Sequence, residues 1–129
     1  MTRTAATHRL LLVEPENLMR RTVAAVARDL HLARIDEASS VAAAERALEA
    51  TRFDGLVLSL DERGQALQML DRLRAGAFYT TARAPVVVMV DACDPGTVMR
   101  MKALEVRRIL LKPFKVKSVL ESVSGLCAA

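Results

Sequence analysis

Five short apolar runs divide this 129-residue chain at nearly regular intervals, and a helix-length segment separates each run from the next. The runs lie at residues 10–13, 32–35, 56–60, 86–90 and 109–111. Three of them are almost continuous leucine and valine, a pattern typical of strands buried on both faces of a parallel sheet. The second run is interrupted by Arg34, which favours a place at the sheet edge. We therefore predict five parallel strands.

The segments between these runs carry apolar residues at three- and four-residue steps, the spacing of one helix face. Ser40 stands where it can cap the second helix, with Glu45 close to the capping-box position. Asp94 followed by Pro95 is the expected start of the fourth helix. Because crossovers between parallel strands are right-handed, helices should cover both faces of an open sheet. The predicted fold class is α/β, a three-layer sandwich of five β-α units.

The length is that of one domain, and residues 9–129 are expected to close a core of their own. Residues 1–8 lack the apolar middle of a signal peptide and are interpreted as a disordered leader. No apolar stretch approaches the ~20 residues that span a bilayer, so no membrane partner is expected. Cys93 and Cys127 are too few for a disulfide framework. We expect two free thiols and a cytoplasmic location.

Ligands of open α/β sheets bind beyond the carboxyl ends of the strands, where the strand order switches. Four of the predicted strands present polar residues there: Glu14-Pro15-Glu16, Ser59-Leu60-Asp61, Val90-Asp91 and Lys112-Pro113-Phe114. His8 and His31 precede the first and second strands and belong to the opposite end of the sheet. We therefore expect the chemistry of this edge to depend on carboxylates, one serine and one lysine.

A family resemblance is carried by four stretches in this alternation, LLLVEPENLMRR, FDGLVLS, APVVVMV and LLKPF. Together they resemble the receiver domain of two-component response regulators, from about Arg9 to the C-terminus. The resemblance implies a flavodoxin-like (CheY-like) fold with strand order 2-1-3-4-5. It also implies a signalling role and not an enzymatic one.

Receivers of this family use a small set of residues for phosphorylation. Two acidic residues after the first strand hold Mg²⁺, and an aspartate that ends the third strand accepts the phosphoryl group. A serine or threonine ends the fourth strand, and a lysine that ends the fifth contacts the phosphoryl oxygens. The resemblance places these positions at Glu14, Pro15, Ser59, Val90 and Lys112.

Most of this set departs from the family pattern. Glu14 keeps a charge but is one methylene longer, Pro15 cannot ligate through its side chain, and Val90 has no hydroxyl. The hydroxyl of Ser59 cannot replace an aspartyl carboxylate, and no base is placed to activate it. Lys112 matches outright. The sequence therefore predicts a degenerate receiver that acts by protein–protein contact without aspartate phosphorylation.

A phosphoryl switch with a displaced acceptor is the alternative. Asp61 lies two residues after Ser59. A two-residue slip of the strand would leave its side chains on the same faces of the sheet. The slip would, however, shorten an already short loop, and a cap for the next helix is the simpler role for Asp61. Lys112 likewise has a simpler role, as the partner of Glu14 in a partly buried ion pair.

Cofactors are not expected at this edge. Glu14 and Asp61, with Glu16 and Asp91, are the candidates for a cation site, but the second acidic position is lost and we expect no bound Mg²⁺. An FMN site of the flavodoxin kind fits poorly, because no Ser/Thr/Gly-rich phosphate loop follows the first strand.

Basic residues gather near the C-terminus of a chain whose formal net charge is +4. Six of them are assigned to one interaction face on the fourth helix, fifth strand and fifth helix: Arg100, Lys102, Arg107, Arg108, Lys115 and Lys117. Either this face is ordinary solvated surface, or it binds an acidic protein or a second copy of the chain. A nucleotide or nucleic acid is the alternative ligand. Aromatic residues make up only 3% of the chain, which argues against single-stranded nucleic acid.

Overall fold

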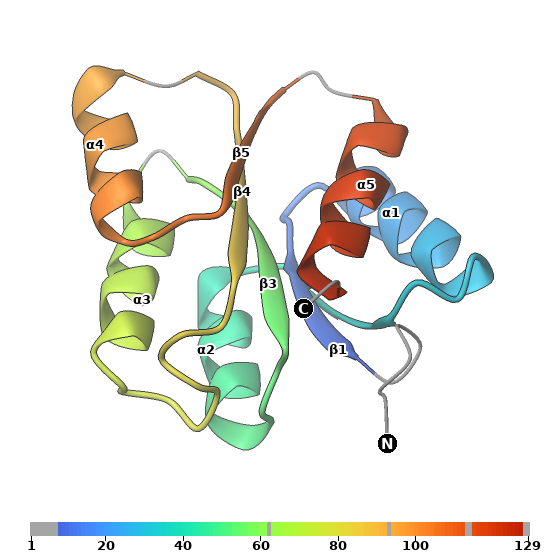
Figure 1. Ribbon diagram of the computed structural model, residues 1–129, viewed down its shortest axis with the longest axis horizontal. Helices are drawn as coiled ribbons and strands as arrows, with labels where there is room; N and C mark the ends of the chain where they lie inside the picture. The colour runs from blue at the N-terminus through green and yellow to red at the C-terminus, as the bar shows by residue number, and fades with distance from the viewer. Residues whose placement is uncertain (1–7, 62, 93, 113–114, 128–129) are drawn as a thin grey trace.

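A computed structural model describes residues 8–61, 63–92, 94–112 and 115–127. Within these residues five strands alternate with five helices, as the apolar runs predict (Figure 1). The strands are β1 (Arg9–Val13), β2 (Arg34–Ala38), β3 (Gly55–Ser59), β4 (Val86–Val90) and β5 (Arg108–Leu111). The helices are α1 (Asn17–Asp29), α2 (Val41–Ala50), α3 (Gln65–Arg74), α4 (Pro95–Ala103) and α5 (Val116–Cys127).

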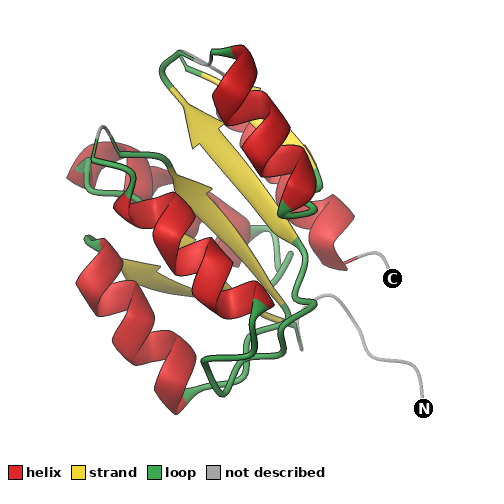
Figure 2. Cartoon of the chain, turned by 90° about the vertical axis from the view of Figure 1, so that its left-hand side faces the viewer, coloured by secondary structure: helices red, strands yellow, loops and turns green. Residues whose placement is uncertain are grey.

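The strands form one parallel sheet in the order β2-β1-β3-β4-β5, which confirms the flavodoxin-like topology. Helices α1 and α5 cover one face of the sheet, and α2, α3 and α4 cover the other (Figure 1). Figure 2 shows the second group of helices in front of the strands. The molecule is therefore a three-layer α/β sandwich.

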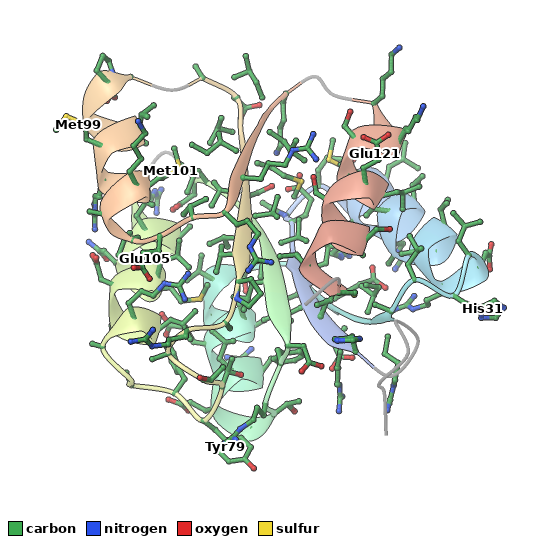
Figure 3. All side chains as sticks on the ribbon, in the orientation of Figure 1. His31, Tyr79, Met99, Met101, Glu105 and Glu121 are labelled. Atoms are coloured by element: carbon green, nitrogen blue, oxygen red, sulfur yellow. The ribbon has the colours of Figure 1, made fainter. Side chains whose placement is uncertain are left out.

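Side-chain alternation along the strands divides the core between the two faces. In β1, Leu11 and Val13 pack on the α2–α4 side, whereas Leu10 and Leu12 pack on the α1–α5 side. All five residues of β3 and of β4 are buried, as expected for the central strands of a covered parallel sheet. Helix α4 shows the same logic: Met101 points toward the sheet and is fully buried, and Met99 points outward (Figure 3).

Strand β2 lies at the sheet edge as predicted, but the predicted range 32–35 is wrong. The strand begins at Arg34 and continues through Asp36 and Glu37, which the apolar pattern could not indicate. Both carboxylates are paired: Asp36 with Arg9 on β1, and Glu37 with two arginines of α1. An edge strand tolerates such charges because its outer side is solvated.

Two of the three predicted capping features are confirmed. The Ser40 hydroxyl accepts a hydrogen bond from the Ala43 N–H at 3.1 Å, and an Asp94 carboxylate oxygen accepts one from the Thr97 N–H at 2.7 Å. The latter bond holds the pKa of Asp94 below its ordinary value. The capping-box role of Glu45 is wrong, because this carboxylate pairs instead with Arg72 on α3.

Several sequence-based predictions fall on residues that the structure does not describe. The predicted leader lies outside the described residues except for His8, and so do Cys93, Pro113 and Phe114. Among the described helices, none combines the length and the apolar composition that a membrane span requires.

Arg74, at the end of α3, links this helix to the loop before β4 and to the end of α4. Its Nε donates to the Leu104 carbonyl after α4 at 2.8 Å, and its Nη1 donates to the carbonyls of Ala82 and Ala84 at 2.9 and 2.7 Å. Burial lowers the pKa of this guanidinium. The planar fork of arginine suits such multiple bonding, and a lysine ammonium has no comparable geometry.

We therefore expect Arg74→Ala to lower the free energy of unfolding by about 3 kcal/mol, because three partly buried carbonyls lose charged donors. Arg74→Lys should fall between this variant and the parent protein. Urea unfolding followed by circular dichroism measures both values. Arg46→Ala, at an exposed position on α2, is the matched control and should change stability by less than about 0.5 kcal/mol. An Arg74→Ala variant as stable as this control would contradict the assigned role.

Candidate functional site

A cleft of about 730 Å³ opens at the carboxyl edge of the sheet, between the loops that follow β1, β3, β4 and β5. Strand order reverses between β1 and β3, so the cleft lies at the topological switch point where ligands of such sheets bind. Its lining residues are Glu14, Pro15, Glu16, Met19, Ser59, Leu60, Asp91 and Lys112. The structure thus brings together four of the five positions that the family resemblance implies.

An ion pair between Glu14 and Lys112 forms the floor of the cleft. The Glu14 Oε1 lies 2.8 Å from the Lys112 Nζ, and their side chains are 2% and 17% exposed. Because β3 and β4 lie between β1 and β5, the pair reaches across the carboxyl ends of both central strands. The Glu14 main-chain carbonyl also accepts a hydrogen bond from Arg20 Nη1 at 2.9 Å, which anchors this end of β1.

Ser59 ends β3 and lies beside Met89 of β4. Its side chain is 6% exposed, and within the described residues its Oγ is the buried side-chain oxygen or nitrogen that lacks a hydrogen-bond partner. Alternation along the strands directs Glu14, Ser59 and Lys112 to the same face, the side covered by α1 and α5. A hydroxyl buried without a partner costs about 1–3 kcal/mol.

Asp61 is engaged elsewhere. Its two carboxylate oxygens accept hydrogen bonds from the backbone N–H groups of Gln65 at 3.2 Å and Ala66 at 2.9 Å, at the start of α3. Gly64, the residue that precedes the helix, offers no side chain for this purpose and adopts φ = 75°. The structure therefore uses Asp61 as the cap of α3, one of the two roles that the sequence left open.

Val90 and Asp61 line a second, adjacent cleft of about 420 Å³ that also includes Thr97 and Arg100. Of the five positions that the family resemblance implies, Val90 is the one that does not line the first cleft. In the described part of the chain, no three His, Cys, Asp or Glu side chains gather closely enough to hold a metal ion. His31 is exposed at the far end of the sheet (Figure 3).

Sequence reasoning missed Arg20, which is buried on α1 and contacts both Glu14 and Glu37. A signal was present in the spacing. Arg20 stands three, four and seven residues before Val23, Ala24 and Ala27, the other buried residues of α1. A basic residue at the spacing of a buried helix face indicates that its charge is paired with a group in the protein interior.

The six basic residues assigned to one interaction face lie on α4, β5 and α5 or directly beside them. Arg100 is bound to Asp71 on α3, with Nη2 and Oδ2 2.5 Å apart. Arg107 and Arg108 lie at the amino end of β5, whereas Lys115 and Lys117 follow its carboxyl end. Lys102 lies on α4, before Arg107 in sequence, so the set includes residues at both ends of β5.

The five-stranded sheet with its carboxyl-edge cleft defines the fold of a CheY-like receiver domain. Solved structures of this kind superimpose over nearly the whole chain. The non-phosphorylated HemR receiver domain from Leptospira biflexa matches with a TM-score of 0.83 and 19% identity, covering 95% of this chain and 96% of that one. Chemotaxis protein CheY4 of Vibrio cholerae matches with a TM-score of 0.79 and 18% identity, covering 94% and 99%.

A response regulator from Thermotoga maritima is similar with a TM-score of 0.77 and 19% identity, covering 95% of this chain and 99% of that one. No protein-family model and no curated protein matches the sequence. At these identities the likeness establishes the fold, and the function has to be argued from the site.

Replacing Ser59 with alanine should not destabilise the protein, because the lost hydroxyl has no partner. We expect the free energy of unfolding to stay unchanged or to rise by about 1 kcal/mol. Thr80→Val is the matched contrast: the buried Thr80 hydroxyl accepts from the Phe53 N–H and donates to the Thr51 carbonyl. That variant should lose about 1–3 kcal/mol in the same urea titration. A comparable loss in Ser59→Ala would show that its hydroxyl is satisfied.

Lys112→Met should lower the free energy of unfolding by about 3 kcal/mol, because it leaves the buried Glu14 carboxylate without its partner. Adding Glu14→Gln to this variant should restore most of the loss. A double-mutant cycle by chemical denaturation measures the coupling. Additive effects of the two substitutions would mean that the ion pair contributes nothing to stability.

Proposed function

We propose that this chain is an atypical receiver domain that acts in signal transduction by protein–protein contact, without phosphorylation of an aspartate. The observation that carries the proposal is Ser59, a buried hydroxyl at the end of β3, where the family resemblance puts the phosphoacceptor. A serine becomes a nucleophile only beside a base. The charged residues at the floor of the cleft are bound to each other: the Lys112 ammonium donates to the Glu14 carboxylate.

The other positions support the same proposal. Pro15 offers no side-chain ligand, so its position lacks the second carboxylate that would help to hold Mg²⁺, the ion that screens an incoming phosphate from the acidic residues. Val90, which stands for the Ser/Thr of the family, lines the neighbouring cleft and has no hydroxyl. Lys112 keeps the family's residue type, and its charge is balanced by Glu14.

A displaced acceptor at Asp61 receives no support from the contacts. Both of its carboxylate oxygens accept backbone hydrogen bonds from α3. A phosphoryl group on either oxygen would remove part of this cap and expose helix N–H groups. We therefore propose that the phosphoacceptor is absent, and not that it has moved to Asp61.

The contact surface that fits this function best is formed by α4 and β5. Met99 and Leu111 are apolar side chains on these elements that are 71% and 60% exposed. Lys102, Arg107 and Arg108 are exposed basic residues on the same two elements or beside them. Such a combination suits an acidic protein partner, since charge complementarity steers association and apolar contacts hold it.

Treatment with acetyl phosphate and Mg²⁺ should leave the intact mass of the protein unchanged, because the end of β3 presents the Ser59 hydroxyl and not a carboxylate. Beryllofluoride with Mg²⁺ should likewise give no Mg²⁺-dependent, saturable amide shifts at residues 14, 59 and 112 in NMR spectra. The DrrB receiver domain, whose solved structure is described as BeF3-activated, is the positive control. A phosphoryl adduct, or saturable shifts that require Mg²⁺, would overturn the proposal.

A further inference from the structure

Loss of phosphorylation does not explain why a polar group remains at the end of β3. Ser59 is 94% buried and its hydroxyl lacks a partner among the described residues, although an alanine there would remove the desolvation cost. A molecule bound in the cleft can supply the partner that such a hydroxyl lacks among the described residues. The cleft of about 730 Å³ above it lies within the range of small-molecule sites.

The floor of the cleft offers hydrogen-bond donors to an oxygen atom. A lysine ammonium has three N–H groups, and the Lys112 ammonium uses one of them for Glu14. The Ser59 hydroxyl adds a donor that can also accept. Both side chains are largely buried, so an oxygen that reached them would replace water in a weakly screened environment.

The mouth of the cleft has the opposite character. Glu16 and Asp91 are exposed there, and the carboxylate of Glu16 already accepts hydrogen bonds from the backbone at the start of α1. Asp91 has no ion-pair partner among the described residues. With Glu14 balanced by Lys112, the cleft keeps an excess of negative charge, which attracts a cation and opposes a purely anionic ligand.

A ligand that satisfies both ends carries an oxygen acceptor at one side and a positive charge at the other. We propose that the cleft binds a small zwitterion of the amino-acid type, non-covalently and without a metal ion. Its carboxylate contacts the Ser59 hydroxyl and the Lys112 ammonium, and its ammonium faces Asp91. This site goes beyond the proposed function, which concerns the loss of phosphorylation and the protein contacts of the domain.

The test is an NMR titration of the ¹⁵N-labelled protein with each of the common amino acids, in the presence of EDTA. At least one amino acid should give saturable amide shifts that centre on residues 59, 60, 91 and 112. Its N-acetyl derivative lacks the positive charge and its carboxamide lacks the negative one. Each should bind at least about tenfold more weakly than the parent amino acid, since each loses one charge-assisted contact.

Two substitutions connect this binding to the cleft. Ser59→Ala and Asp91→Asn should each weaken the affinity by about tenfold, whereas Ser124→Ala and Asp29→Asn, at exposed positions on α5 and α1, should leave it unchanged. Spectra of the variants without ligand report whether each one is folded. Asp91→Asn keeps the shape of the side chain, so it tests the charge alone.

Three results would overturn the proposal. One is the absence of saturable shifts with every amino acid at concentrations up to about 10 mM. Another is binding that neither Ser59→Ala nor Asp91→Asn weakens. The third is inorganic phosphate that binds as tightly as the best amino acid, which would mark the cleft as an anion site. None of these results touches the proposed function, which fails only on a phosphoryl adduct or on Mg²⁺-dependent beryllofluoride binding.

Discussion

The ion pair between Glu14 and Lys112 is the interaction on which the carboxyl edge of this protein depends. It joins residues 98 positions apart in sequence and crosses two strands to do so. Each strand step in a sheet is about 4.8 Å, so both long side chains must extend over the ends of β3 and β4. The pair and Ser59 together line the floor of the cleft. A shorter acid at position 14 would reach less far, and the cleft would be more open.

The same pair bears on the function proposed for this edge. The family resemblance implies a lysine that contacts phosphoryl oxygens, and Lys112 at this position donates to the Glu14 carboxylate. A buried pair of this kind contributes little net stability, yet removing one partner is costly because the remaining charge is desolvated. Its presence therefore constrains sequence change at both positions. Ser59 carries no such constraint from stability, since its hydroxyl has no partner among the described residues.

The sequence predicted the parts of the fold that follow from hydrophobic periodicity. Strands β3 and β4 were found because their residues are buried on both faces and read as continuous apolar runs. Strand β2 was misplaced because Asp36 and Glu37 are compensated by arginines that lie far away in sequence. Arg74 was missed for a related reason: its partners are backbone carbonyls, which leave no trace in residue identity. A local sequence pattern cannot show which distant residue will pair with a charged side chain.

The candidate site was predictable to a similar extent. The order of strands places residues after β1, β3, β4 and β5 at one edge, so the membership of the cleft followed from the fold. The orientation of individual side chains did not, and Asp61 shows why. Its position two residues beyond Ser59 is compatible with the cleft or with the helix, and the choice depends on which backbone N–H groups lie within reach. Both carboxylate oxygens of Asp61 accept hydrogen bonds from α3. Asp91 is therefore the cleft acid that has no partner in the described structure. The charge of the cleft thus depends on which carboxylates cap helices and which remain unpaired. A different choice of capping residue would change which ligands the edge attracts.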